Sequence, residues 1–129
     1  MKLLYRTALI VMVLAAPAVA AMDWSQAQPV IVVASDYHFS PGKLTFKRGV
    51  AYRLRIENHG KELHEFNAPK FFKSVELGDP AVLNADRTEI AVHPGAAKDL
   101  IFVPKKAGRY RLICPDHDWA GMTGEITVE

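Results

Sequence analysis

A strict alternation of side chains between residues 52 and 57 narrows the possible folds of this chain more than any other feature. Apolar Tyr52, Leu54 and Ile56 are separated by charged residues at 53, 55 and 57. Successive side chains of a β-strand point to opposite faces, so this period of two predicts a strand with one buried and one solvated face. The same alternation recurs at 43–47 and at 109–114. We therefore expect β-strands rather than amphipathic helices.

Further short runs of apolar residues are spaced along the chain. They predict strands at 29–34, 63–67, 88–92, 98–103 and 123–128. Turn-forming residues separate the strands, at Ser40-Pro41-Gly42, Asn58-His59-Gly60, Pro94-Gly95 and Lys106-Ala107-Gly108. About eight short strands with almost no helical periodicity predict an all-β fold, an antiparallel sandwich or barrel whose strands cross between two sheets.

One segment, residues 68–85, interrupts this rhythm. Its apolar residues do not alternate strictly, and Gly78 and Pro80 break the pattern. We predict a long connection here, with one helical turn packed against the strands.

The first 21 residues have the composition of an export signal. Lys2 and Arg6 precede an uncharged, mostly apolar stretch at 7–16, and Pro17 is followed by Ala18-Val19-Ala20, a pattern that signal peptidase accepts. The alternative is an uncleaved membrane anchor, but the uncharged run from 7 to 22 is shorter than the roughly 20 residues that cross a bilayer. We predict a signal peptide at 1–21, cleaved to leave a periplasmic or otherwise exported domain at 22–129 without stable membrane insertion.

The remaining 108 residues are enough for one domain with a modest core. Without Lys2 and Arg6, fourteen basic residues balance fourteen acidic ones. This balance argues against nucleic acid as a partner. We expect a monomer.

The chain has a single cysteine, Cys114, so no internal disulfide can form. An unpaired thiol in an exported protein calls for an explanation, because that environment is oxidising. Binding to a metal as a thiolate would protect it. The alternative is a buried structural cysteine that acts as a small hydrophobic residue.

The neighbours of Cys114 favour the metal. His117 and Met122 lie within nine residues of it, so one loop offers a thiolate, an imidazole and a thioether, a set that suits copper better than zinc or calcium. A period of two from Leu112 turns Cys114 inward, and Met122 is in phase with Ile126 on the next strand. This pattern indicates a type 1 copper site.

A second histidine is needed to complete such a site. We predict His64, because it follows the strand at 52–57 and shares its phase with apolar Phe66. The other candidates, His38, His59 and His93, are expected to be surface or packing residues.

These motifs resemble the cupredoxins, especially those of the plastocyanin and pseudoazurin kind. The resemblance rests on Cys-x-x-His-x-x-x-x-Met with Gly121 before the Met, on Gly108-Arg109-Tyr110, on Asn58 followed by His64, and on the closing strand at 124–128. It implies a Greek-key β-sandwich that holds one copper ion. His64, Cys114 and His117 would be the equatorial ligands, with Met122 as a weak axial ligand, in a protein that carries single electrons.

Two features depart from that family. The residue after the first ligand histidine is Glu65, where a small polar residue is usual. By strand phase we expect Glu65 to point away from His64, although so close a carboxylate could still shift the reduction potential. Asp116 and Asp118 flank His117 on what the family resemblance implies is an apolar docking face.

We expect a copper protein that is not an enzyme. Nucleophilic catalysis by Cys114 and His117 would leave Met122 unexplained, zinc rarely recruits a thioether, and a binuclear copper centre would need a second cysteine in the loop. Electron transfer between redox partners docking near His117 and Trp119 is the main hypothesis, although Trp119 could instead pack over the loop as a lid. The alternative is a copper carrier or copper-tolerance protein that binds the ion for delivery or sequestration.

Overall fold

A computed structural model describes residues 12–18 and 21–129 of the chain. Most of the predicted signal peptide, namely residues 1–11 and 19–20, lies outside the described residues. Within the described part, there is no helix with the length and apolar character needed to span a bilayer.

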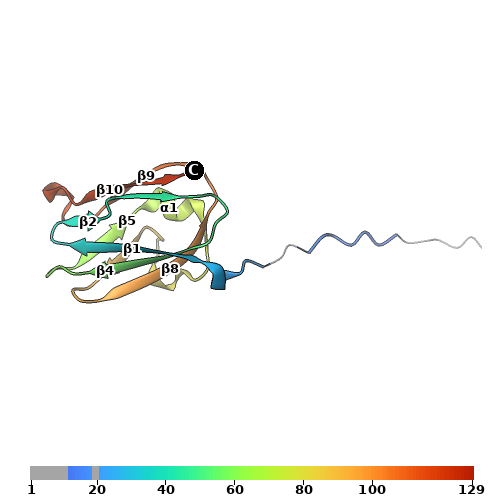
Figure 1. The fold of residues 1–129 in the computed structure, drawn as a ribbon, viewed down its shortest axis with the longest axis horizontal. Coiled ribbons are helices and arrows are strands. Elements are labelled where there is room, and N and C mark those ends of the chain that lie inside the picture. The colour runs from blue at the N-terminus through green and yellow to red at the C-terminus, as the bar shows by residue number, and fades with distance from the viewer. Residues whose placement is uncertain (1–11, 19–20) are drawn as a thin grey trace, which may run out of the picture.

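Two five-stranded sheets form a β-sandwich, which confirms the predicted all-β fold (Figure 1). The first sheet contains, in order, β2 (His38–Ser40), β1 (Gln28–Ser35), β4 (Tyr52–Asn58), β8 (Ala97–Pro104) and β6 (Val75–Leu77). The second contains β3 (Lys43–Phe46), β10 (Thr123–Val128), β9 (Gly108–Ile113), β5 (His64–Asn67) and β7 (Glu89–Val92). The described residues thus form ten strands rather than about eight, the additions being the three-residue β2 and β6.

Six of the eight strand pairs of the described residues are antiparallel, as expected, but two are parallel, so both sheets are mixed. β1 runs parallel to β4, with Ala34 opposite Asn58 at the end of the pair. β10 runs parallel to β3, whereas its pairing with β9 is antiparallel. Parallel neighbours arise because the chain crosses between the two sheets, so these strands are not joined by a hairpin.

The core lies between the two sheets and is rich in aromatic side chains. Phe46 and Phe102 approach it from opposite sheets, with ring centroids 5.2 Å apart. Phe71 packs edge-on against Phe102 at 5.3 Å and is fully buried. The inward residues of β4 are also buried, as their alternation predicts.

The connection at 68–85 contains the predicted helical turn and one strand that was not predicted. α1 (Pro69–Ser74) begins with a proline, whose fixed backbone angle suits the first position of a helix. It buries Phe71 and Phe72 against the sandwich. β6 follows directly, and the short 3-10 helix η2 (Pro80–Val82) completes the segment.

Candidate metal centre

Cys114 lies immediately after β9 at one end of the sandwich, and its side chain is completely buried. Its amide donates to the Met122 carbonyl at 3.0 Å, and the His117 amide donates back to the Cys114 carbonyl at 3.0 Å. The loop between β9 and β10 is therefore folded tightly around the thiol. It contains the 3-10 helix η3 (Asp118–Ala120).

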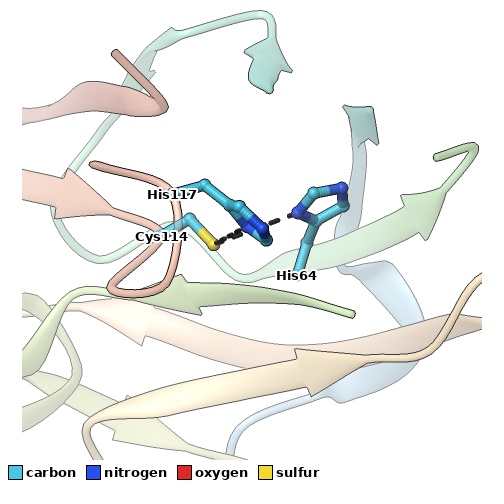
Figure 2. A group of neighbouring side chains, drawn as sticks. All are labelled: His64, Cys114 and His117. Carbon is cyan, nitrogen blue, oxygen red and sulfur yellow. Dashed lines mark hydrogen bonds between the residues drawn. The ribbon is translucent and has the colours of Figure 1, made fainter. Parts of the chain in front are cut away.

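His64, the first residue of β5, comes from another part of the second sheet and is also buried. The structure brings His64, Cys114 and His117 together, with one ligand atom of each within 4.8 Å of the others. Figure 2 shows both imidazoles turned toward the sulfur. The sulfur lies 4.0 Å from Nδ1 of His64 and 3.4 Å from Nδ1 of His117.

These distances fit a shared metal ion. Thiolate and imidazole ligands lie about 2.0–2.3 Å from an ion such as zinc, so two of them can be at most about 4.6 Å apart. Both sulfur–nitrogen distances satisfy this limit. The combination of one soft thiolate and two imidazoles suits copper in both of its oxidation states.

Met122 lies at the boundary between this loop and β10. Its side chain is fully buried, as the strand phase predicted. Its amide donates to the His117 carbonyl at 3.3 Å, so its backbone contacts both Cys114 and His117. The thioether thus belongs to the buried end of the same loop.

Burial raises the pKa of the Cys114 thiol to about 11 in the metal-free protein. The thiol is therefore protonated near neutral pH until a metal displaces its proton. It donates a hydrogen bond to Oε2 of Glu65 at 3.2 Å, and the backbone amide of Glu65 donates to the sulfur at 3.5 Å.

Glu65 was expected to point away from His64, and that expectation did not anticipate that its carboxylate reaches the Cys114 sulfur from the other side. Its side chain is buried, and its carboxylate contacts the sulfur. The reason is that Cys114 lies beside the backbone of β5 rather than over one face of it, so a long side chain can reach it from the opposite face to His64. Burial raises the pKa of the Glu65 carboxyl.

Two further carboxylates were not identified from the sequence. Asp36 lies between β1 and β2, and its Oδ1 is 2.6 Å from Nε2 of His64. Glu62, between β4 and β5, has its Oε2 2.7 Å from Nε2 of His117. No local motif marks either residue, because each contact depends on how distant loops meet.

Two aromatic side chains, Tyr37 and Trp119, form a row of rings that starts at His117. The Tyr37 ring lies over the His117 ring at a centroid distance of 4.6 Å, and Trp119 is 6.0 Å from Tyr37. Trp119 is 77% exposed and donates from its indole nitrogen to the Asp116 carbonyl at 2.9 Å. His117 itself is only 9% exposed.

The remaining histidines lie outside the cluster and are exposed, in agreement with the prediction. His38 contacts the Ser35 hydroxyl at 3.2 Å, and His59 lies 2.9 Å from the Glu57 carboxylate. His93 is in the turn that follows β7.

Comparison with known proteins connects this centre to a family. The family model described as the cupredoxin-like domain matches residues 6–128. The copper-resistant cuproprotein CopI of Rubrivivax gelatinosus is 31% identical over 105 residues, which cover 76% of this chain and 64% of that protein. The CopI of Pseudomonas aeruginosa is 27% identical, with coverage of 76% and 74%. The chain thus spans less than two thirds of the Rubrivivax relative.

Solved structures agree on the fold. Auracyanin from Roseiflexus castenholzii superposes with a TM-score of 0.59 at 19% identity, covering 80% of this chain and 98% of that one. Auracyanin A from Chloroflexus aurantiacus gives 0.53 at 21% identity, with coverage of 78% and 99%. The family match spans nearly the whole chain and the buried donor set suits the metal, so this protein belongs to the cupredoxins and its cofactor is copper at a type 1 site.

Proposed function

We propose that this protein is an exported or periplasmic copper-tolerance protein that binds one copper ion and retains it, without converting a substrate. His64, Cys114, His117 and Met122 would hold the ion. When bound, copper can exchange one electron between Cu(I) and Cu(II), and this donor set accommodates both states.

The observation that carries this proposal is the likeness to two proteins that are named copper-resistant cuproproteins. The likeness takes in three quarters of this chain. We infer the tolerance role from that likeness, since the ligands alone are equally suited to delivery, storage or electron transfer.

The enclosure of the site supports retention. All four proposed ligands are buried, and the outer nitrogens of both histidines contact carboxylates rather than solvent. Ligand exchange with an incoming acceptor would require these contacts to open. A site built in this way favours holding the ion over rapid delivery.

A growth assay tests the proposal. The full chain is expressed in a copper-sensitive bacterium, and growth is measured against copper concentration. The proteins compared are wild type, Cys114→Ser and His64→Ala, with His93→Ala as the control for a histidine outside the site. Wild type and His93→Ala should raise the tolerated concentration, whereas Cys114→Ser and His64→Ala should not. Equal protection by Cys114→Ser, at equal protein abundance, would show that tolerance does not depend on this site.

Electron transfer remains a second candidate, favoured by the row of aromatic rings from His117 through Tyr37 to exposed Trp119. A redox partner docking over Trp119 would meet this row. The electron self-exchange rate of the copper-loaded protein distinguishes the two functions. A fast rate that falls in Trp119→Ala would support electron transfer, and a slow rate that is unchanged in that variant would support retention.

A further inference from the structure

Each copper-binding imidazole uses its two nitrogens for different contacts. The Nδ1 atoms of His64 and His117 face the Cys114 sulfur. The Nε2 atoms point to carboxylates, at 2.6 Å for Asp36 and 2.7 Å for Glu62. A carboxylate can only accept, so each Nε2 carries the proton and each Nδ1 is left with the lone pair that a metal requires.

Asp36 is fixed in place by the loop that joins β4 to β5. While Oδ1 accepts from His64, Oδ2 accepts from the Lys61 amide at 2.9 Å. A side chain at Gly60 would force this pair to shift, because its Cβ would overlap Asp36 Oδ1 and lie 2.9 Å from His64 Nε2. The backbone therefore packs closely against this pair.

The same loop carries Glu62. Asn58 is buried; its side-chain nitrogen donates to the Glu62 carbonyl at 2.7 Å, and its side-chain Oδ1 accepts from the Gly60 amide at 2.8 Å. Tyr37 covers the His117 ring beside this carboxylate. Both acidic residues are thus positioned by one short loop.

We propose that Asp36 and Glu62 are positioning residues that act through His64 and His117 to bias the bound copper toward Cu(II). Hydrogen bonds from ligand histidines to carboxylates fix the ring orientation and make the coordinating nitrogen more basic. Two negative charges near the ion also stabilise a divalent cation more than a monovalent one. This inference rests on the copper ligation proposed above and adds an oxidation-state preference to it.

The two contacts should differ in strength. The Asp36 side chain is 25% exposed and its His64 partner 1%, whereas Glu62 is 49% exposed and His117 11%. Water screens the charge of Glu62 more effectively, so the Asp36 contact should have the larger effect.

The reduction potential of the copper-loaded protein tests this inference. Glu62→Gln removes the charge but keeps an oxygen that can accept from His117, and its exposed position makes the substitution compatible with folding. Loss of such a partner typically weakens metal binding about 10- to 100-fold. We expect a tenfold loss of Cu(II) affinity relative to Cu(I), a rise in potential of about 59 mV, since a tenfold change corresponds to that value for one electron. Asp36→Asn should raise the potential further.

Glu76→Gln is the matched control. Glu76 carries the same charge but lies on β6, on the opposite edge of the first sheet from β2, and pairs with Lys105. Its potential should equal that of wild type. If Glu62→Gln and Asp36→Asn also match wild type, or if Glu76→Gln rises equally, the carboxylates do not act through the histidines and the inference is wrong. If wild type itself lacks a thiolate-to-copper absorption band, the proposed ligation is wrong instead.

Discussion

Replacing Asn58 by alanine is predicted to destabilise the metal-free protein substantially. The Asn58 side chain is 1% exposed and joins three backbone segments. Its amide nitrogen donates to the carbonyls of Glu62 at 2.7 Å and of Val92 at 2.8 Å, and its oxygen accepts from the Gly60 amide at 2.8 Å. Alanine would remove all three hydrogen bonds and leave their partners in place.

The expected loss follows from the burial of those partners. A buried carbonyl that loses its donor costs about 1–3 kcal/mol, which applies to Val92, and each of the two part-buried bonds contributes about 1 kcal/mol. The free energy of unfolding should therefore fall by about 3–5 kcal/mol. This is a large share of the roughly 5–15 kcal/mol that stabilises an ordinary domain.

Equilibrium unfolding in urea, followed by circular dichroism, measures this change. Asn84→Ala is the matched control, because Asn84 also makes three hydrogen bonds, to Thr88 and Glu89, but is exposed. Water can replace its bonds, so its loss should be less than half that of Asn58→Ala. If Asn58→Ala lowers the free energy of unfolding by less than about 1 kcal/mol, with an unchanged slope of that free energy against urea concentration, the three hydrogen bonds of Asn58 do not stabilise the fold as argued.

Three other outcomes follow from the structure. Gly60→Ala should weaken copper binding at least tenfold in a competition titration, because the Cβ of the alanine would displace the Asp36 carboxylate from His64. Unchanged copper affinity would contradict the close packing of Gly60 against this pair. The affinity of the metal-free protein for copper should increase with pH between about 7 and 9, by up to about tenfold per pH unit. The reason is that the Cys114 thiol has a pKa of about 11 and must release its proton to bind the metal. A copper affinity that does not change with pH would mean that the thiolate is not a ligand. Phe71→Ala should lower the free energy of unfolding by about 3–5 kcal/mol in urea titrations, since it empties a fully buried position; a loss under 1 kcal/mol would show that the core closes around the gap.

The strands were predictable wherever side chains alternate over at least four residues. The alternation at 52–57 corresponds to β4, and the predicted strand at 123–128 matches β10. β2 and β6 were missed because each has only three residues, too few to establish a period. Their assignment depends on the neighbouring strand with which each pairs.

The cluster of His64, Cys114 and His117 was predictable because Cys114 and His117 lie in one loop that also carries Met122. His64 could be added from phase, since it occupies the buried face of a strand. The same phase argument placed Glu65 on the face opposite His64 but missed its contact with the sulfur, because it treats side chains as perpendicular to the sheet. The sulfur lies 3.5 Å from the backbone nitrogen of Glu65, level with the strand itself, and a flexible side chain reaches it from the other face.

The missed carboxylates have a topological cause. β1 and β4 run parallel, with Ala34 opposite Asn58, so the segments that follow both strands leave the sheet at the same end. Asp36 follows β1 and Glu62 follows β4, and their partners His64 and His117 lie at this end of the sandwich. Had β1 and β4 been antiparallel, Asp36 would lie at the opposite end of the sandwich from Glu62. Alternation of side chains reports which face is buried but not the direction of the neighbouring strand. The direction of one strand pair therefore determines whether the copper histidines acquire their carboxylate partners.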